Sequence, residues 1–582
     1  MSYKKTISSY NNKMGIKFFY KWLFGNYSSC IKGFRKSSPP KDVVIDTFLV
    51  DMNGLFHNSA QRVFKYGNGA PKQSILRPTS VEPVQYNDRT QMACFQDITT
   101  TLEELVTLVK PKQTLVLAID GVAPASKINQ QRQRRFRSAM TEMPFGSFNP
   151  ISITPGTSFM DALSNYIDWY IKKRVSESEL WRGLNVVFST EKQPGEGEHK
   201  LIEYIRKHGK DDETFCINAL DADLVMLSLA TFRPRFYLLR DEQYSRDYDY
   251  SYVSVNGIRN ELEKVLFWDG CDKKTLIKDF ILICFLCGND FLPNIPSISI
   301  IENGLDTMIN IYKRNKLHLV DENNKIILPA FKSFLELVGV CEEGMIIQRI
   351  INKAEYIPDP MLEKYSTITY FSDATEEGSE AKPIVNFDIN GYKVEYYTKK
   401  EVSSNSMHTY ITGCQWVFTY YLDGVKDWTW LYPYNYAPFA GDIARSIDTY
   451  VPVDKFDTNA PISPFEQLLC VIPPKSSYLL PKPLNSLLRS RVFSRFSPET
   501  FTVNCAGKKF EYEGIVELPP VDINIVSSEY SKMKHLVNPA ELSRRNISKG
   551  ACKYVYTPSE PSFYRSKFGN IKNYCVEVMD VN

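Results

Sequence analysis

Short apolar runs alternate with amphipathic stretches along the first half of the chain. Four of these runs have the length and composition of buried strands: residues 48–50, 115–119, 184–188 and 214–220. The stretches between them place apolar residues at helical spacing, most clearly over residues 153–175. Strands that alternate with helices predict an α/β fold with a mainly parallel central sheet and flanking helices.

Acidic residues follow three of the four predicted strands. Asp51 comes after the first run, Asp120 after the second, and Asp221 and Asp223 after the fourth. Because the carboxyl ends of parallel strands share one edge of a sheet, we expect these four acids to lie close together.

Three further acids enlarge this set. Glu196 and Glu198 stand two residues apart before a predicted helix, and Asp290 follows an apolar helix predicted over residues 278–287. Carboxylates at close range repel one another unless cations intervene. We therefore predict two Mg²⁺ or Mn²⁺ ions, the arrangement that promotes phosphodiester hydrolysis. The alternative is that acids after strands only form turns and helix caps.

The segment after Pro124 is strongly basic and predicts a helix. Lys127, Gln131, Arg134 and Arg135 fall at positions i, i+4, i+7 and i+8, so they share one helix face. An amide and three cations on one face suit phosphate. The alternative is a solvated helix face, which is the usual role of a run of charges.

A histidine near the first acid is a further candidate. Asn53 and Gly54 predict a turn after the first strand, and His57 lies six residues beyond Asp51. A structural role in the turn or core and a role in the site are equal alternatives for His57.

Composition narrows the cellular setting and the charge pattern. The 582 residues carry 70 Lys+Arg against 67 Asp+Glu, a net charge of +3, so a nucleic-acid surface has to be a local patch. The twelve cysteines lack the paired spacing of a zinc site and predict reduced thiols of an intracellular protein. No apolar run approaches the ~20 residues needed to span a membrane, which predicts a soluble protein.

Six motifs resemble, in the same order, the catalytic region of the XRN family of 5′→3′ exoribonucleases. They are DMNGLFHN from residue 51, DGVAPASKINQQRQRRFRSA from 120, ITPGTSFM from 153, PGEGEHKLIEYIR from 194, LDADLVMLSL from 220 and CGNDFLPNIP from 287. Residues 413–443 and later segments are similar to the family's second conserved region. One residue of the family's opening, usually proline, is missing between Ile16 and Lys17.

The resemblance implies a role for each candidate residue. The family's metal-binding acids match Asp51, Asp120, Glu196, Glu198, Asp221, Asp223 and Asp290, and its 5′-phosphate pocket matches Lys127, Gln131, Arg134 and Arg135. The histidine that stacks on a terminal base matches His57, and a tryptophan opposite it matches Trp428 or Trp430. For Tyr432 and Tyr434 in the same stretch we expect core positions.

The resemblance also implies an organisation of the chain. Residues 1–13 are expected to form a polar arm, 14–304 a PIN/FEN-like nuclease region, 305–390 connecting helices with a shortened polar spacer, and 391–582 a mixed α+β second conserved region packed on the first and completing its pocket. We expect a compact form of the family, with no appended domains after the second region.

These implications predict a metal-dependent, processive 5′→3′ exoribonuclease that converts 5′-monophosphorylated single-stranded RNA to nucleoside 5′-monophosphates in RNA decay. A monomer is expected in the cytoplasm, with the nucleus as the alternative, and the sequence names no protein partner. Three other functions compete: a flap-type DNA nuclease, an inactive RNA-binding scaffold of the same family, and a 5′-end kinase or phosphatase. The last is disfavoured because neither a P-loop nor a catalytic cysteine loop is present.

Overall fold

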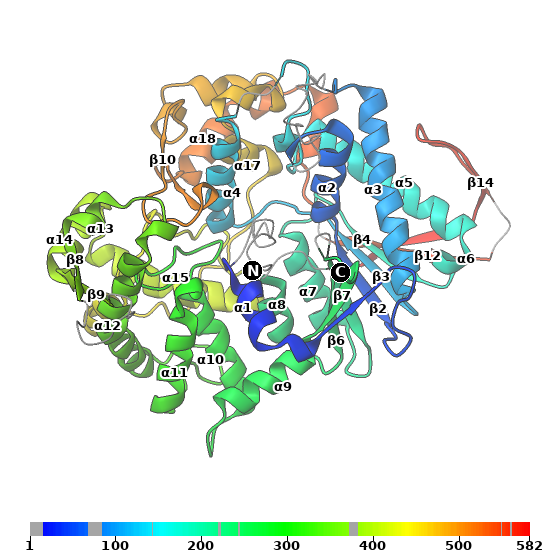
Figure 1. Ribbon diagram of the computed structural model, residues 1–582. Helices are drawn as coiled ribbons and strands as arrows, with labels where there is room; N and C mark the ends of the chain where they lie inside the picture. Colours follow the sequence, from blue (N-terminus) through cyan, green and yellow to red (C-terminus); the bar gives the residue numbers. More distant parts are fainter. Residues whose placement is uncertain are drawn as a thin grey trace, which may run out of the picture.

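A twisted β-sheet runs through the computed structural model, which describes residues 16–67, 84–141, 144–218, 223–242, 245–371, 382–548, 550–558 and 562–581 (Figure 1). Within these residues the sheet has nine strands in the order β1-β7-β6-β5-β2-β3-β4-β12-β15. Their bounds, in chain order, are β1 Ile31–Phe34, β2 Thr47–Asp51, β3 Thr114–Ala118, β4 Asn185–Ser189, β5 Phe215–Asn218, β6 Phe236–Asp241, β7 Tyr250–Ser254, β12 Ala551–Tyr556 and β15 Val576–Val581.

The five central strands of the sheet are parallel to one another. β2 pairs with both β3 and β5, and parallel pairing continues outward to β4 on one side and β6 on the other. Antiparallel strands complete both edges, β7 and β1 beyond β6, and β12 and β15 beyond β4. The predicted α/β fold with a mainly parallel sheet is therefore confirmed.

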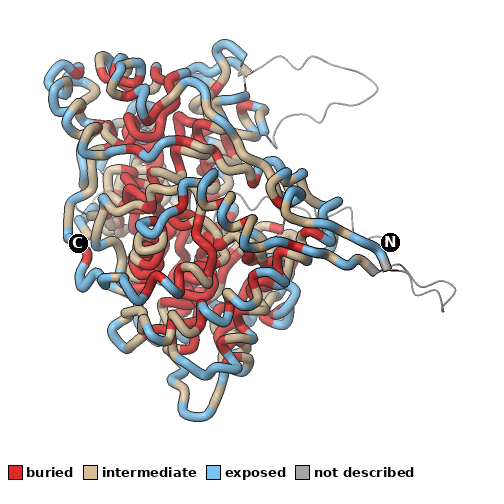
Figure 2. Tube along the Cα trace, turned by 90° about the vertical axis from the view of Figure 1, so that its left-hand side faces the viewer, coloured by how far each residue is buried: buried red, intermediate tan, exposed pale blue. Residues whose placement is uncertain are grey.

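Helices cover both faces of the sheet, because alternate strand residues are apolar on each side. Phe48 and Leu115 point into one core, and Leu49 and Val116 into the other. The first core is covered by α2 (Met52–Phe64), α3 (Asp88–Val109) and α5 (Ser158–Glu177), and the second by α1 (Phe19–Asn26), α7 (Gly197–His208), α8 (Asp223–Leu229), α9 (Val255–Leu266) and α10 (Lys273–Phe285). Buried residues fill the interior of the trace in Figure 2.

The basic helix forms as predicted and is held by the second half of the chain. α4 spans Ala125–Ser138 and packs against α17 (Pro464–Val471) (Figure 1). Ile128 of α4 lies in one apolar cluster with Phe465 of α17 and Val526 of α18 (Ile523–Met533). The carbonyl of Trp428 accepts the Ala125 N–H at 2.8 Å, so the start of α4 is also fixed by the second region.

A second helical layer follows the sheet region along the chain. It consists of α11 (Gly304–Asn315), α12 (Leu328–Ile351), α14 (Ile389–Lys399), α15 (Ser404–Asp423) and α16 (Ala440–Ser446). The polar spacer was expected within residues 305–390. The described part of this region contains α13 (Pro360–Lys364) and the paired strands β8 (Ser366–Phe371) and β9 (Lys382–Phe387). Its side chains Leu362 and Phe387 are buried in a small core, which explains the regular structure.

Shorter elements complete the described chain. They are α6 (Glu179–Arg182), β10 (Thr502–Asn504) paired with β11 (Ile515–Glu517), β13 (Ser562–Tyr564) paired with β14 (Ile571–Tyr574), and 3-10 turns at Ser28–Cys30, Pro150–Ser152, Ile300–Glu302, Lys353–Glu355, Ile447–Thr449, Pro474–Leu479, Leu484–Arg489, Phe493–Arg495, Glu511–Glu513, Lys534–Leu536 and Pro539–Arg545.

One local prediction is wrong. Asn53 and Gly54 do not form a turn but lie in the first turn of α2, which begins directly after β2. Asp51 makes this possible because its Oδ1 accepts the Asn53 N–H at 3.0 Å and caps the helix.

Two further findings concern the chain as a whole. All twelve cysteines carry free thiols. Among the described helices, none is long and apolar enough to cross a membrane.

Candidate active site

Two predicted acids meet above the carboxyl end of the central strands. Asp51 ends β2 and pairs in register with Ala118 of β3, so Asp120 follows two residues further along the neighbouring strand. The Gly197 N–H donates to Asp120 Oδ1 at 2.6 Å. A methyl group at Gly197 would lie 2.7 Å from Asp51 Oδ1 and 3.3 Å from Asp120 Oδ1, so the start of α7 fits between both carboxylates only as glycine.

Two other acids share the ammonium group of Lys127. Glu196, the N-cap residue of α7, forms a short ion pair with Lys127, and Asp290 Oδ2 lies 2.6 Å from Lys127 Nζ. Burial by itself lowers the pKa of Lys127, but Asp290 and Glu196 outweigh it and raise the pKa well above its ordinary value. Lys127 therefore stays charged and holds these acids next to α4.

A tyrosine from the second region contacts the same carboxylate. The buried Tyr420 of α15 donates its hydroxyl to Glu196 Oε1 at 2.9 Å. His199 stacks in parallel on the Tyr420 ring at 3.7 Å, and burial, together with Lys127, lowers its pKa far below the ordinary value. Desolvation also raises the pKa of Glu196, and Lys127 opposes that rise. The Tyr420 hydroxyl thus stabilises a carboxylate held in a dry environment.

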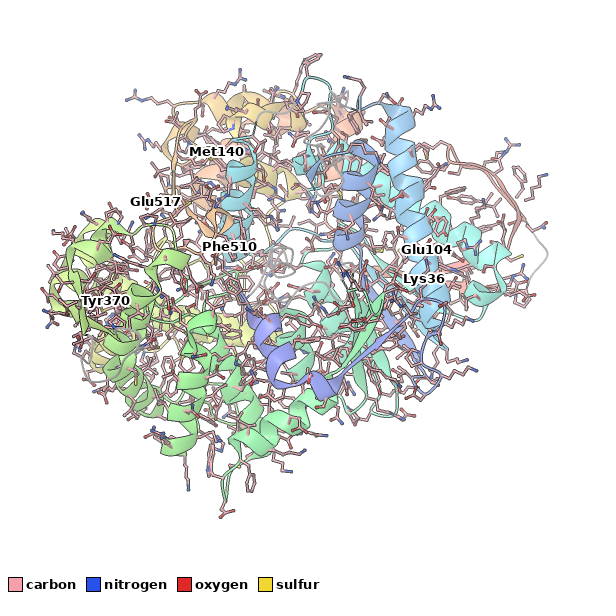
Figure 3. All side chains as sticks on the ribbon, in the orientation of Figure 1. Lys36, Glu104, Met140, Tyr370, Phe510 and Glu517 are labelled. Carbon is pink, nitrogen blue, oxygen red and sulfur yellow. The ribbon has the colours of Figure 1, made fainter. Side chains whose placement is uncertain are left out.

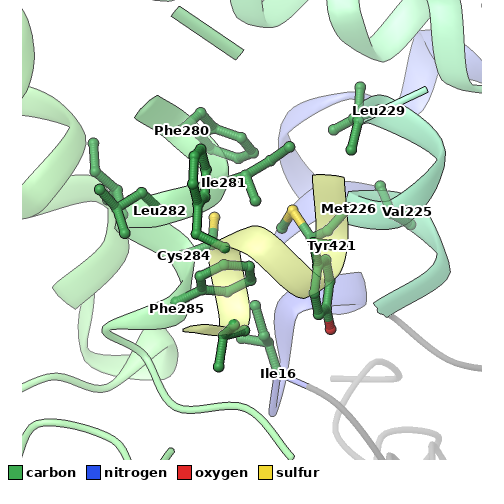
Figure 4. Close-up of a cluster of buried hydrophobic side chains, with 14 of the residues drawn as sticks. Ile16, Val225, Met226, Leu229, Phe280, Ile281, Leu282, Cys284, Phe285 and Tyr421 are labelled. Atoms are coloured by element: carbon green, nitrogen blue, oxygen red, sulfur yellow. The ribbon is translucent and has the colours of Figure 1, made fainter. Parts of the chain in front are cut away.

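The remaining acids lie on neighbouring elements. Asp223 begins α8, and its Oδ1 accepts the Ile16 N–H at 3.1 Å. Glu198 is buried in the first turn of α7, and Asp221 lies outside the described residues. Figure 4 shows a buried apolar cluster in which Ile16 and Tyr421 are drawn with side chains of α8 and α10. One core therefore positions the elements that carry Asp223 and Asp290.

The donor set fits a hard divalent cation in its chemistry. Every candidate ligand is a carboxylate oxygen, the group that Mg²⁺ and Mn²⁺ prefer. In the part of the chain that the structure describes, no three His, Cys, Asp or Glu side chains converge closely enough to hold a metal ion as they stand. The acids instead meet in pairs, around Gly197 and around Lys127.

The predicted phosphate residues lie along α4 with different surroundings. Arg135 is buried, donates to Gln131 Oε1 at 3.0 Å and to Thr154 Oγ1 at 2.9 Å, and has no ion pair among the described residues. Burial, followed by the charge of Arg134, lowers the pKa of Arg135 to about 9, and Asp120 opposes this change. A buried cation held by neutral groups can receive an anion.

The predicted stacking residues are only partly buried. His57 lies in α2. The Trp430 ring stacks on the buried Trp416 ring with centroids 5.0 Å apart, which gives Trp430 a packing role. Trp428 lies in a loop, and its own backbone carbonyl accepts the N–H of Ala125 at the start of α4. Tyr432 is buried and Tyr434 packs against the same core, so the core positions expected for both are confirmed.

Three buried residues of the site were missed by sequence reasoning. Lys200 donates to the carbonyls of Ile119 and Thr190 at 2.7 and 2.9 Å and thereby ties two strand ends together. A cation inside the motif PGEGEHK was a signal for Lys200 and for its neighbour His199. No local pattern marks Tyr420, which lies 224 residues from Glu196.

The fold and the site define an α/β protein with carboxylates at the carboxyl edge of its parallel sheet, the edge where such proteins bind ligands, and with a neighbouring helix that carries buried cations. Comparison with protein families identifies the family. Residues 14–242 match the family described as XRN 5′-3′ exonuclease N-terminus, and residues 270–366 and 361–572 match the Xrn1 helical domain. The chain belongs to the XRN family.

Similar curated proteins carry exoribonuclease names. The chain is 27% identical to human 5′-3′ exoribonuclease 1 over 97% of its own length and 37% of that protein. Against the Saccharomyces cerevisiae 5′-3′ exoribonuclease 1 the values are 26%, 97% and 46%, and against the Gallus gallus 5′-3′ exoribonuclease 2 they are 26%, 93% and 72%. The chain thus spans less than half of the first two proteins.

Among solved structures, the catalytic core of Rad2 in complex with DNA substrate matches with a TM-score of 0.30 and 12% identity, over 51% of this chain and 69% of that chain.

Proposed function

We propose that this protein is a divalent-metal-dependent 5′→3′ exoribonuclease that removes nucleoside 5′-monophosphates processively from 5′-monophosphorylated single-stranded RNA. The observation that carries the proposal is the position of α4. The first turn of this helix contacts the acids through Lys127, and two turns further on the helix buries Arg135, which donates to Gln131. One helix thus presents cations for a terminal phosphate and also contacts carboxylates suited to phosphodiester hydrolysis.

The side chains divide the work between binding and chemistry. Gln131, Arg134 and Arg135 bind the terminal phosphate, and Lys127 lies between that phosphate and the acids. His57 and Trp428 stack on the first bases, because Trp430 is engaged with Trp416.

Two Mg²⁺ or Mn²⁺ ions fit the oxygen-only donor set of Asp51, Asp120, Glu196, Glu198, Asp221, Asp223 and Asp290. When bound they polarise water and stabilise the leaving oxygen. Gly197 orients Asp120 and Tyr420 orients Glu196, so the protein fixes both carboxylates before substrate arrives.

Two features support the proposed oligomeric state and cellular compartment. The site takes Lys127 from the first region and Tyr420 from the second region of one chain, so a monomer suffices. The twelve free thiols fit a reducing compartment, and we propose the cytoplasm as the place of action.

A comparison of RNA ends tests the proposal. Single-stranded RNAs labelled at the 3′ end and carrying a 5′ monophosphate, a 5′ hydroxyl or a cap are incubated with Mg²⁺, and nucleotide release is followed by chromatography. We expect the monophosphorylated RNA to decay at least tenfold faster and to release nucleoside 5′-monophosphates. Equal decay of all three ends, release from the 3′ end, or preferred cleavage of branched DNA would contradict it.

Two variants assign the observed decay to this site. Arg135→Met should remove the preference for the 5′ monophosphate, because the buried cation is lost. Asp120→Asn should abolish decay and leave RNA binding in place, which separates the enzyme from an inactive scaffold. The control for a lost cation is Arg182→Met, because the Arg182 guanidinium packs over the ring of Tyr556 in β12 and neither residue belongs to the site.

A further inference from the structure

Six side chains from three separate segments form a surface beside the start of the described chain. Phe510 is labelled there in Figure 3, close to the amino-terminal end of the ribbon. We call it the aromatic-basic surface, and its members are Lys17, Phe18, Arg137, Lys508, Phe510 and Tyr512. None of them belongs to the acid cluster or to the phosphate residues of α4.

The three aromatic rings lie in a row, and the outermost ring is exposed to solvent. The rings of Phe510 and Tyr512 are nearly parallel, 9° apart, with centroids 5.2 Å from each other. Phe18 approaches Phe510 from the other side at 6.4 Å. Tyr512 is 50% exposed, so one face of the stack is accessible. A planar group such as a nucleic-acid base can extend it.

Among the described residues, the three cationic members form one ion pair with a carboxylate, that of Lys17 with Glu513. Lys17 Nζ is 4.0 Å from Glu513, and Arg137 donates to the backbone carbonyls of Tyr512 and Gly514. Lys508 forms no ion pair with any described residue. Burial and then the charges of Lys17 and Arg349 lower the pKa of Lys508 to about 8, and Glu513 and Asp359 oppose this change. Cations held together against their repulsion favour a bound anion.

The surface is connected to the candidate active site at two points. Ile16, the residue before Lys17, donates its N–H to Asp223. Arg137 lies on α4, two residues beyond Arg135, and holds the loop that carries Tyr512. The surface therefore begins at the residue that follows the contact with Asp223.

We propose that the aromatic-basic surface binds the single-stranded RNA that follows the nucleotides held in the active site. Lys17 and Lys508 contact phosphates, and a base stacks on Tyr512, whose loop is held by Arg137. Bases have to be unpaired to stack, so the surface selects single strands. This proposal rests on the proposed function, because it requires RNA as the substrate.

Length-dependent binding tests the surface. Dissociation constants for 5′-monophosphorylated oligouridylates of 3 and 12 nucleotides are measured by fluorescence anisotropy in EDTA, with RNA integrity checked on gels. For Tyr512→Ala we expect the 12-nucleotide RNA to lose about five- to 100-fold in affinity, the worth of one stacked base, and the 3-nucleotide RNA to lose far less. For Lys508→Gln, the slope of log affinity against log salt should fall by ~0.7 for the longer RNA.

Matched variants control for general loss of aromatic rings and charge. Tyr370→Ala removes a ring that is 70% exposed on β8, and Lys316→Gln removes an exposed cation after α11; neither should change the ratio of the two affinities. The surface is disproved if Tyr512→Ala and Lys508→Gln leave that ratio and the salt slope at wild-type values. If Tyr512→Ala unfolds, the salt slope of Lys508→Gln decides. Failure of the wild-type protein to bind either RNA overturns the proposed function as well.

Discussion

Replacing Tyr420 by phenylalanine should raise the Mg²⁺ concentration that the proposed activity requires. The substitution keeps the ring that stacks on His199 and removes only the hydroxyl, which lies 2.9 Å from Glu196 Oε1. Glu196 is buried, so its oxygen has no water to replace that donor. A hydrogen bond to a charged group contributes about 1.5–3 kcal/mol, equivalent to roughly 10- to 100-fold in an equilibrium constant.

The direction of the effect follows from the carboxyl group. Desolvation already raises the pKa of Glu196, and loss of a donor to the ionised form raises this pKa further. Protons then compete better with the metal. We expect half-maximal activity of Tyr420→Phe at about 10-fold or more higher Mg²⁺, with the acidic limb of the pH profile moved to higher pH.

A second tyrosine on the same helix provides the control. Tyr410 is also buried in α15, but its hydroxyl donates to the carbonyl of Pro293 at 3.0 Å and not to an acid. Tyr410→Phe should lower the free energy of unfolding by about 1 kcal/mol and leave the Mg²⁺ titration unchanged. The reasoning is refuted if both variants have the same Mg²⁺ dependence, measured by nucleotide release across a metal series.

Three further perturbations test the site. Gly197→Ala should reduce activity by at least 100-fold, because the added methyl group meets Asp51 Oδ1 at 2.7 Å. The control Gly183→Ala has open space around the added methyl group and should retain activity. Equal rates of the two variants would contradict the packing argument. Burial lowers the pKa of Lys200 from 10.5 to about 7. The unfolded state therefore binds more protons than the folded state between these two values, so the free energy of unfolding rises as the pH increases from 7 toward 10.5. In urea unfolding, wild type should gain on the order of 2 kcal/mol over Lys200→Met between pH 7 and pH 9, and parallel curves would refute this. Lys127→Met leaves two buried carboxylates without their cation, which should lower the free energy of unfolding by about 3–5 kcal/mol. Mg²⁺ should therefore raise the melting temperature of this variant more than that of the wild type. An equal rise in both proteins would disprove the bridging role of Lys127.

The part of the fold near the strand ends was predictable because its signals are local. Strands buried on both faces need continuous apolar runs, so β2 and β3 were visible directly in the sequence. The spacing of α4 was likewise visible, since helical periodicity places residues on faces without further information. The roles of the acids and of the α4 residues stay predictions, because their side chains meet in pairs and Asp221 is outside the described chain.

Contacts between distant segments were not predictable. Tyr420 and Glu196 come together only after two regions have packed, and neither residue type is unusual in its own segment. The turn predicted at Asn53 failed for a related reason. Turn propensity is weak, and a side-chain cap from Asp51 is enough to start a helix there.

The pairing of β12 with β4 has a consequence for biosynthesis. β4 ends at residue 189 and receives its neighbour only when residues 551–556 have been made, about 360 residues later. At roughly 5–20 residues per second, the ribosome needs about 20–70 s for that interval. During this time one border of the nascent sheet exposes unpaired backbone groups, which are a template for aggregation. The growing chain therefore has a window in which a chaperone that shields strand edges would raise the yield of folded protein.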